Sequence, residues 1–385
     1  MSQTGEEPRR IRVMMVGPFP RSPAMIDGGV ASAVTYLSQA LAKRTDIDLV
    51  GVRIAKDQND ACEVRKYDWP MADLQLGRLG LSTLYRRQQR QLGELIAHFR
   101  PDIVHGQESD IAGFLAVRSG LPAVVTVHGL LGECAKFQTD RVRRVRAILA
   151  AKLTERSTIR ASENLIVISP YVTRYYEKDI RGQTHHIPNA VSSSFFAVTR
   201  KPEPGRFLYA GRIANGKGLL DLLQSVALCG DQVEKLVLAG ATPDPAYELT
   251  VRQEVERLEL GPRVIFAGLL DEKALLDEIS RASALVLPSY QETAPMVVQE
   301  AMAAGLAVIA TTVGGICDQV ENGVTGLLFK PGDVSALAGL LARLCDDPTL
   351  CQRLGAAAKS VAERRYRADA VASATAAVYR SMRTG

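Results

Sequence analysis

Two glutamates, Glu292 and Glu300, lie eight positions apart in the stretch PSYQETAPMVVQEAMAAG, residues 288–305. The short apolar run 284–287 before them predicts a buried strand, and a predicted helix with Pro295 in its first turn carries the second glutamate. Both carboxylates can then face one crevice at the carboxyl end of the strand, where open α/β sheets place their ligands. The alternative is an amphipathic helix with two solvated glutamates, so the pair needs support from other motifs.

A second motif, GRIANGKG at 211–218, places Arg212 and Lys217 around a glycine-bearing loop between a predicted strand and a predicted helix. Two cations and the amides at a helix start form a site for a diphosphate. The motif is not a P-loop, because Gly218 follows the lysine and no hydroxyl is placed for Mg²⁺. If the diphosphate is a leaving group, each cation would stabilise it by about 2–4 kcal/mol. We therefore expect no metal ion and no other cofactor; a loop with two solvated cations is the alternative.

Two weaker signals lie earlier in the chain. Gly28-Gly29 opens a predicted helix, where backbone N–H groups can approach an anion, although a simple tight turn explains the pair equally well. The spacing is not G-x-G-x-x-G, which disfavours a dinucleotide site and an NAD oxidoreductase. His128 lies at the carboxyl end of a predicted strand, 123–129, and open α/β sheets place their catalytic residues at this end of the strands. The alternative is a structural role, which is the usual one for a lone histidine.

The elements that must position these residues alternate regularly between apolar strands and helices, which predicts parallel, doubly wound sheets. The alternation starts at 10–17 and restarts at 206–213 after a linker rich in Ser and Pro. We therefore predict two Rossmann-like domains, over 1–195 and 196–365, followed by a helix in 366–385.

The motif GR-x₄-KG followed by Glu292, seven residues and Glu300 resembles the signature of the large retaining glycosyltransferase family four. The resemblance is most specific over 206–333 and looser over 10–191. It implies the GT-B fold, in which two Rossmann-like domains face a deep cleft. The domain over 1–195 would then bind the acceptor and the domain over 196–365 the donor, and the helix in 366–385 would cross back onto the first domain. At 292–295 this chain has ETAP, where many members of that family have the glycine-rich sequence E-G-F-G. This departure bears on the identity of the donor more than on the reaction.

The resemblance also implies roles for individual residues. Glu300 would accept hydrogen bonds from ribose hydroxyls, Glu292 would face the donor sugar, and His128 would line the cleft. The catalytic residues are expected to be Glu292, His128, Arg212 and Lys217. The expected donor-binding residues are Gly28, Gly29, Arg212, Lys217, Gly240, Leu269, Leu270, Glu292, Ala294, Pro295, Met296, Val297 and Glu300.

The function implied is a cytoplasmic retaining glycosyltransferase that moves a sugar from a UDP-, GDP- or ADP-linked donor to a hydroxyl. The acceptor would be a glycan, a glycolipid or a small molecule, as in polysaccharide biosynthesis. A nucleotide-sugar epimerase and a non-catalytic nucleotide-sugar-binding subunit are the alternatives. The glycogen synthase branch is less favoured, because Ile26 stands where that branch has a lysine.

Composition excludes several other classes. The six cysteines show no metal-ligand spacing, the start of the chain has no apolar signal segment, and no run of about 18 apolar residues occurs. The net charge is +5, but residues 1–199 hold 27 Lys+Arg against 20 Asp+Glu, a balance of +7. This half suits an anionic membrane or a phosphate-bearing acceptor, whereas stacking aromatics for nucleic acid are absent.

The segment 136–160 concentrates this charge, with eight basic and two acidic residues. Its apolar residues recur at helical spacing on one face, so the segment is either a helix lying on the inner face of a membrane or one packed on the sheet. We expect the packed arrangement, with the arginines solvated. The face consists of Val142, Val145, Ile148, Leu149 and Leu153.

Overall fold

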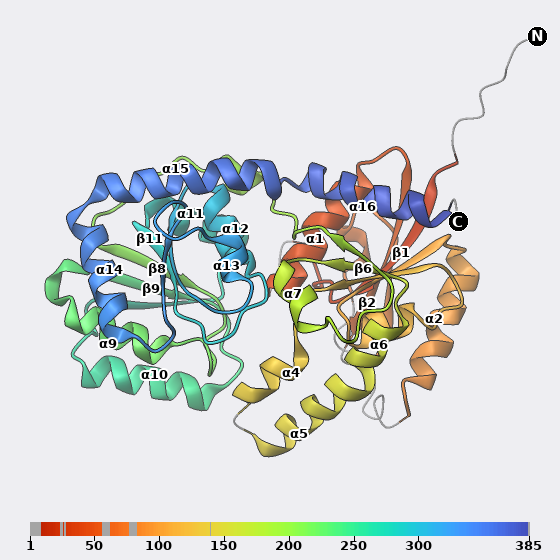
Figure 1. Ribbon diagram of the computed structural model, residues 1–385, viewed down its shortest axis with the longest axis horizontal. Helices are drawn as coiled ribbons and strands as arrows, with labels where there is room; N and C mark the ends of the chain where they lie inside the picture. The colour runs from red at the N-terminus through yellow and green to blue at the C-terminus, as the bar shows by residue number, and fades with distance from the viewer. Residues whose placement is uncertain are drawn as a thin grey trace, which may run out of the picture.

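The computed structural model describes residues 9–23, 26, 28–55, 62–76, 83–138 and 140–383 of the 385-residue chain, without the side chain of Arg143. The described residues form two α/β lobes that lie side by side (Figure 1). Each lobe contains a sheet whose strand pairings are all parallel. The predicted pair of doubly wound parallel sheets is confirmed. Residues 1–8, which carry most of the expectation about a signal segment, lie outside the described residues.

The first sheet has the strand order β3-β2-β1-β4-β5-β6-β7. Its central strand β1, IRVMMVG, is buried on both faces, which explains its continuous apolar sequence. The strands are β1 (Ile11–Gly17), β2 (Ile47–Ala55), β3 (Met71–Gln75), β4 (Ile103–Gln107), β5 (Ala123–Val127), β6 (Asn164–Val167) and β7 (Gln183–His186).

The second sheet has the order β10-β9-β8-β11-β12-β13. Its strands β8, β11 and β12 are buried along their whole length. The strands are β8 (Arg206–Ala210), β9 (Lys235–Ala239), β10 (Val264–Gly268), β11 (Ala284–Leu287), β12 (Ala307–Thr311) and β13 (Leu327–Phe329).

Helices cover both sheets. Those of the first lobe are α1 (Gly29–Ala42), α2 (Arg86–Phe99), α3 (Ile111–Ala116), α4 (Leu131–Cys134), α5 (Arg141–Ala150), α6 (Arg156–Ala161) and α7 (Pro170–Tyr175), with a π-helical turn at Ala151–Glu155 and 3₁₀ turns at Val64–Lys66 and Ala135–Phe137. The segment between the sheets contains the short helix α8 (Ser193–Phe196).

Aspartates begin several helices of the second lobe. Asp244 accepts hydrogen bonds from two backbone amides at the start of α10, and Pro245 occupies the first turn, where its missing N–H costs nothing. The helices are α9 (Leu219–Leu228), α10 (Pro245–Arg257), α11 (Glu272–Arg281), α12 (Met296–Ala303), α13 (Ile316–Gln319), α14 (Val334–Asp346), α15 (Pro348–Arg365) and α16 (Ala368–Arg383), with a 3₁₀ turn at Gly230–Gln232.

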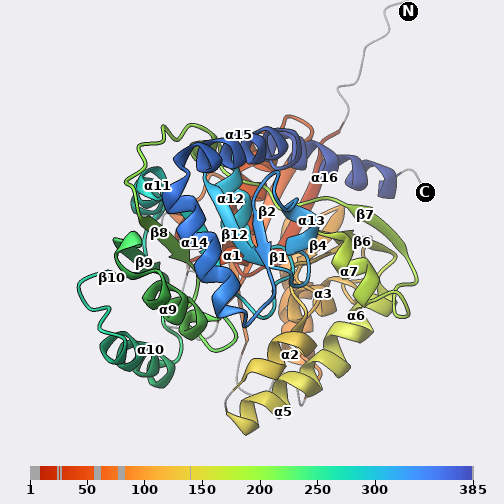
Figure 2. The same ribbon diagram turned by 60° about the vertical axis from the view of Figure 1, so that its left-hand side comes forward.

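The last two helices connect the lobes. Figures 1 and 2 show α15 over the second lobe and α16 continuing over the first. Helix α16 packs on α1, and Arg380 forms an ion pair of 2.7 Å with Asp46 of the first lobe. The buried hydroxyl of Tyr379 lies 2.6 Å from Nδ1 of His105 in β4. The last helix of the chain therefore follows the second lobe in sequence but packs on the first lobe, and so links the two lobes.

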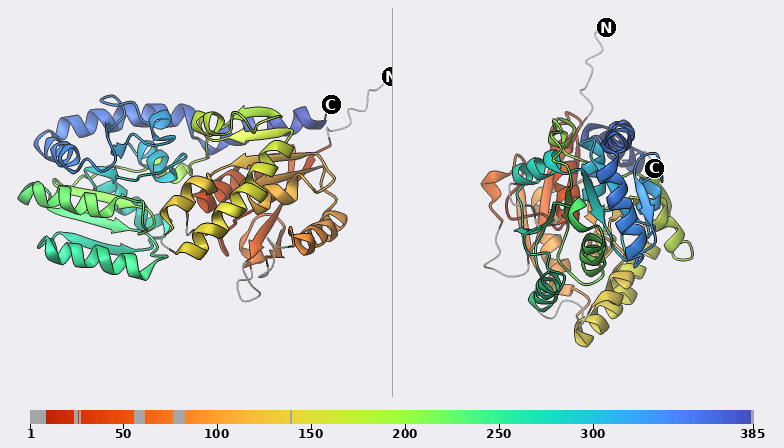
Figure 3. Two further views of the ribbon diagram at one scale, coloured as in Figure 1. Left: turned by 60° about the horizontal axis from the view of Figure 1, so that its bottom comes forward. Right: turned by 90° about the vertical axis from the view of Figure 1, so that its left-hand side faces the viewer.

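The expectation that the apolar face of 136–160 packs on the sheet is wrong. Its five large apolar side chains, from Val142 to Leu153, are between 39% and 67% exposed. Burial in this segment begins only at Ala151, in the π-helical turn that follows α5. Figure 3 shows the yellow segment with α5 reaching outward along the first lobe. Amphipathic spacing specified an apolar face, but no described part of the chain covers that face.

Candidate active site

A cleft of about 630 Å³ lies between the two sheets, at the carboxyl ends of their strands. The first lobe contributes the ends of β4 and β5 and the start of α1, and the second lobe contributes the ends of β8 and β9 and the segment that leads into α12. All of the predicted site residues lie on its wall: Gly28, Gly29, His128, Arg212, Lys217, Gly240, Leu269, Leu270, Glu292, Ala294, Pro295, Met296, Val297 and Glu300.

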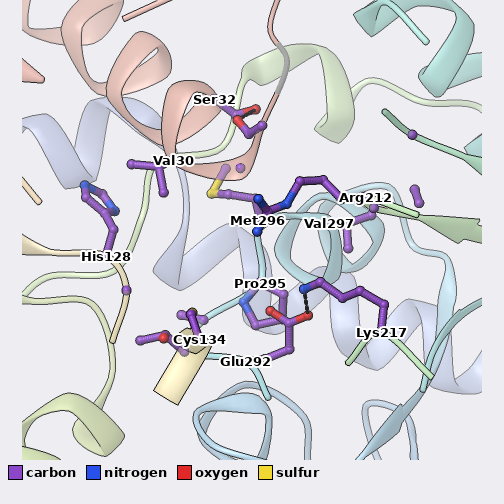
Figure 4. Close-up of a pocket in the computed structure, with 18 of the residues that line it drawn as sticks. Val30, Ser32, His128, Cys134, Arg212, Lys217, Glu292, Pro295, Met296 and Val297 are labelled. Carbon is purple, nitrogen blue, oxygen red and sulfur yellow. Dashed lines mark hydrogen bonds and ion pairs between the residues drawn. The ribbon is translucent and has the colours of Figure 1, made fainter. Parts of the chain in front are cut away.

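The loop after β8 brings a cation to a carboxylate. Nζ of Lys217 lies 2.6 Å from Oε1 of Glu292, and the same oxygen accepts a hydrogen bond of 2.8 Å from the Ser289 hydroxyl (Figure 4). Gly218 makes this approach possible, because its φ is +70° and a Cβ there would lie 2.1 Å from the carbonyl oxygen of Pro288. Two motifs some 75 residues apart in sequence therefore form one ion pair.

Arg212 extends from the same loop. Its guanidinium is exposed and has no ion-pair partner in the part of the chain that the structure describes, while its carbonyl oxygen accepts a 2.7 Å hydrogen bond from Tyr209. Gly240, at φ +147°, packs against this loop, since a Cβ there would lie 2.0 Å from the carbonyl oxygen of Gly211. The cleft thus offers one unneutralised cation at the end of β8.

Glu300 lies deeper, on the buried side of α12. The side chain is 4% exposed, and burial, aided by the nearby Glu272 carboxylate, raises the pKa of Glu300 to about 8. Glu272 itself accepts hydrogen bonds from the hydroxyls of Tyr36, at 3.0 Å, and Ser194, at 2.7 Å. The two glutamates of the sequence motif therefore differ chemically: Glu292 is paired with a cation, and Glu300 holds its proton at neutral pH.

His128 faces the cleft from the first lobe, across from Lys217 and Glu292 (Figure 4). It is 8% exposed, and burial lowers its pKa to about 4, so the ring is neutral at pH 7. Nε2 lies 2.7 Å from the amide oxygen of Gln107, which fixes the proton on Nε2. Nδ1 is left as a hydrogen-bond acceptor without a partner among the described residues.

Sequence reasoning missed three carboxylates on this side of the cleft, Glu108, Asp110 and Glu155. The first two directly follow β4, so the strand-end rule that selected His128 would have found them. Glu155 had no such signal, because the π-helical turn at Ala151–Glu155 turns it toward the cleft. Its Oε1 accepts a 2.8 Å hydrogen bond from the backbone amide of Leu131.

One Asp-x-Asp triplet, a pattern that can hold a divalent cation, is present at Asp46-Ile47-Asp48. Its carboxylates are engaged elsewhere: Asp46 pairs with Arg44 at 2.9 Å and Arg380 at 2.7 Å, and Asp48 pairs with Arg12 at 2.5 Å. The triplet stands at the start of β2, the opposite end of the sheet from the cleft.

Two family profiles match the chain: one described as Glycosyltransferase Family 4 over residues 27–195, and one described as Glycosyl transferases group 1 over residues 192–361. A glycogen synthase of Mycobacterium tuberculosis is 30% identical over 303 residues, which cover 74% of this chain and 70% of that protein. A D-inositol 3-phosphate glycosyltransferase of Streptomyces scabiei is 30% identical over 306 residues, covering 72% and 67%.

Among solved structures, a sucrose-phosphate synthase from Thermosynechococcus elongatus superposes with a TM-score of 0.82 at 25% identity, covering 97% of this chain and all of that one. HepE of Anabaena, in complex with UDP, has the same fold, with a TM-score of 0.75 at 17% identity over 96% of this chain and 100% of that one. These matches do not favour the epimerase or the non-catalytic alternative. The chain belongs to the group 1 glycosyltransferases of GT-B fold, which transfer a sugar from a nucleotide-sugar donor.

Proposed function

We propose that this glycosyltransferase is retaining and metal-independent, and that Arg212 and Lys217 hold the diphosphate of its donor. The observation that carries the proposal is the pair of cations on one loop, facing the start of α12 across the cleft. Amides at a helix start and two guanidinium or ammonium groups neutralise a diphosphate without a divalent ion. Lys217 would leave Glu292 for the phosphate when the donor binds, and the released carboxylate would then face the sugar.

The proposed reaction is a displacement on one face of the sugar. The bond between the anomeric carbon and the phosphate oxygen breaks, and its electron pair leaves with the diphosphate. The acceptor hydroxyl forms the new bond on the same face and gives its proton to the departing phosphate oxygen. Glu292 would stabilise the positive charge that develops on the sugar, while Arg212 and Lys217 stabilise the negative charge on the diphosphate. The anomeric configuration is thereby retained.

Donor recognition is proposed to use the remaining residues of the second lobe. Glu300 would accept hydrogen bonds from the ribose hydroxyls, and the half-exposed Leu269 with Leu270 would form the wall for the base. The backbone around Met296, at the start of α12, lies against Gly29 of the first lobe, where a Cβ would be 3.5 Å from the methionine side chain. A sugar diphosphate would lie beside these two helix starts, which both line the cleft.

Calorimetric titration with UDP, GDP and ADP, with and without EDTA, tests the donor site. We expect one nucleotide to bind equally in both conditions and binding to be lost in the Arg212→Ala/Lys217→Ala variant. Lys178→Ala, an exposed cation outside the cleft, is the control and should bind normally. Binding that survives the double change, or that needs a metal, would disprove this assignment. The NMR spectrum of the sugar released by slow donor hydrolysis, recorded before mutarotation, reports whether configuration is retained.

We also propose that the first lobe contacts an anionic membrane through α5. Four exposed apolar side chains lie on α5, whose other positions are rich in arginine, and exposed Leu153 follows in the π-helical turn. A basic amphipathic helix of this kind binds anionic lipid. No helix among the described residues is long and apolar enough to span a membrane. Attachment through a surface helix would bring the cleft close to a glycolipid acceptor.

Co-sedimentation with vesicles tests this contact. We expect wild-type protein to bind vesicles of equal parts phosphatidylcholine and phosphatidylglycerol, and not vesicles of phosphatidylcholine alone. Replacing Val142, Val145 and Leu149 by serine should abolish binding. Leu228→Ser/Leu249→Ser, which removes similarly exposed apolar side chains from the second lobe, should not. Equal binding by both variants would refute the contact.

A further inference from the structure

The first lobe's wall of the cleft carries hydrogen-bond acceptors and no cation. Glu108 and Asp110 follow β4, Glu155 comes from the π-helical turn, and His128 ends β5. None of the described first-lobe residues on the cleft wall is Lys or Arg, although this half of the chain is the basic one. Its positive charge lies elsewhere, with a cluster of arginines on α5.

The charges on this wall are not balanced locally. Burial, together with repulsion from Asp110 and Glu155, raises the pKa of Glu108 well above its ordinary value, and only Arg212, from the opposite lobe, opposes the shift. Burial likewise raises the pKa values of Asp110 and Glu155, although hydrogen-bond donors beside both carboxyls already oppose the shift: backbone amides at the start of α3 for Asp110, and the amides of Leu131 and Gly132 and the hydroxyl of Tyr176 for Glu155. Carboxyl groups held in this way gain from a ligand that brings hydrogen-bond donors or positive charge.

His128 adds an acceptor rather than a cation. Its proton is fixed on Nε2 by Gln107, whose amide nitrogen lies 3.2 Å from His105; the ring of His105 is in turn held by Tyr379. Nδ1 of His128 is buried and has no hydrogen-bond partner within normal distance among the described residues, so it can accept a hydrogen bond from a ligand. The side chain of Asn189, also on the cleft wall, interacts with the ring and opposes the lowering of its pKa. The neutral ring cannot attract a phosphate.

The two walls therefore suit different groups. A phosphate on the acceptor would face three acidic side chains and a neutral imidazole, and no Lys or Arg of the described first lobe lies on this wall to neutralise it. Hydroxyl and ammonium groups, by contrast, would satisfy the acceptors. The cations of the cleft stand on the second lobe, at Arg212 and Lys217, where the donor diphosphate is proposed to bind.

We propose that the acceptor is an amino-bearing sugar or cyclitol without phosphate on its accepting ring, bound to Glu108, Asp110, Glu155 and His128 through ammonium and hydroxyl groups. The inference rests on the proposed function, since it assigns the acceptor half of the same cleft. It separates this enzyme from relatives whose name specifies an inositol phosphate acceptor.

The test uses three probes that share one ring: glucosamine, glucose and glucose 6-phosphate. Each is titrated by ligand-observed NMR into the full-length protein saturated with the nucleoside diphosphate that binds in calorimetry. We expect glucosamine to bind about tenfold more tightly than glucose, because one charge-assisted hydrogen bond contributes on that scale, and glucose 6-phosphate not to bind. The preference should fall about tenfold in Glu108→Gln and in Glu155→Gln.

Both variants keep the size of the side chain, and Glu155→Gln also keeps an amide oxygen that can accept the hydrogen bond from Leu131. Nucleotide affinity reports that the cleft is intact. Glu133→Gln, at a carboxylate that is paired with Lys136 outside the cleft, should keep the full preference. The proposal is overturned if glucosamine fails to bind, if glucose 6-phosphate binds as well, or if the preference survives both changes. If no nucleoside diphosphate binds the wild-type protein, the proposed donor site is refuted instead. The same sugar titrations without nucleotide would then still test the proposed acceptor preference.

Discussion

Replacing Glu300 by glutamine should stabilise the protein in a pH-dependent way. Burial raises the pKa of this carboxyl from its ordinary 4.5 to about 8 in the folded chain. Below pH 4.5 the carboxyl is protonated in both the folded and the unfolded state, so it has no effect on the pH dependence of stability. Between pH 4.5 and 8 the unfolded chain ionises while the folded chain retains the proton, and the free energy of unfolding therefore falls as pH rises.

The size of the effect follows from the difference between the two pKa values. Each unit corresponds to about 1.4 kcal/mol, so the folded chain loses about 3 kcal/mol by pH 7 and about 5 kcal/mol above pH 8. Glutamine has nearly the same shape and never ionises, so Glu300→Gln removes this loss. The variant should match the wild type near pH 4.5 and exceed it increasingly up to pH 8, at the expense of donor binding.

Urea unfolding between pH 5 and 9 measures the effect. Wild-type protein, Glu300→Gln and the exposed control Glu321→Gln are compared, and the difference in unfolding free energy is plotted against pH. We expect the Glu300→Gln difference to rise from under about 1 kcal/mol at pH 5 to a plateau above pH 8, and the control to follow the wild type. A difference that does not change with pH would show that Glu300 is ionised in the folded protein, and the reasoning would fail.

Three further predictions follow from the same geometry. Nucleotide affinity should increase as pH rises toward 8 and then level off, because ribose hydroxyls favour the ionised form of Glu300; calorimetry of Glu300→Gln should show no such rise. Gly315→Ala should lower both the melting temperature and the transfer rate, the latter at least about tenfold, since the new Cβ would lie 1.7 Å from the carbonyl oxygen of Thr293 beside the catalytic loop; an unchanged rate would contradict it. Tyr379→Phe removes the hydroxyl that lies 2.6 Å from His105 and should cost about 1 kcal/mol of stability in urea unfolding, whereas no loss would show that the bond contributes nothing.

Part of the cleft could be predicted because its motifs are local. In the loop that ends in Lys217-Gly218, a strand end, a cation and glycines with positive φ are adjacent in sequence, so spacing alone indicates a phosphate site. Glu292 and Glu300 are connected by a single helix start, and their shared crevice follows from helix geometry. All the residues chosen in this way lie on the wall of the cleft.

The features of the site that sequence analysis could not reach depend on contacts between distant segments. Glu155 reaches the cleft through a π-helical turn, and His128 is fixed by Gln107, which is held through His105 by the last helix of the chain. No pattern in one segment reports such a partner. The same limit explains the wrong expectation for Val142 and its neighbours: periodicity specifies which face of a helix is apolar, but only the surrounding structure decides what covers it.

The sequence by itself determined the alternation of apolar strands and helices, the division into two parallel sheets and the positions of the donor-site motifs, because each depends on residues close together in the chain. The tertiary structure alone decided the protonation of Glu300, the pairing of Lys217 with Glu292 and the acidic wall opposite them. Burial and electrostatic interaction act through space, and folding brings together charges that lie far apart in the sequence.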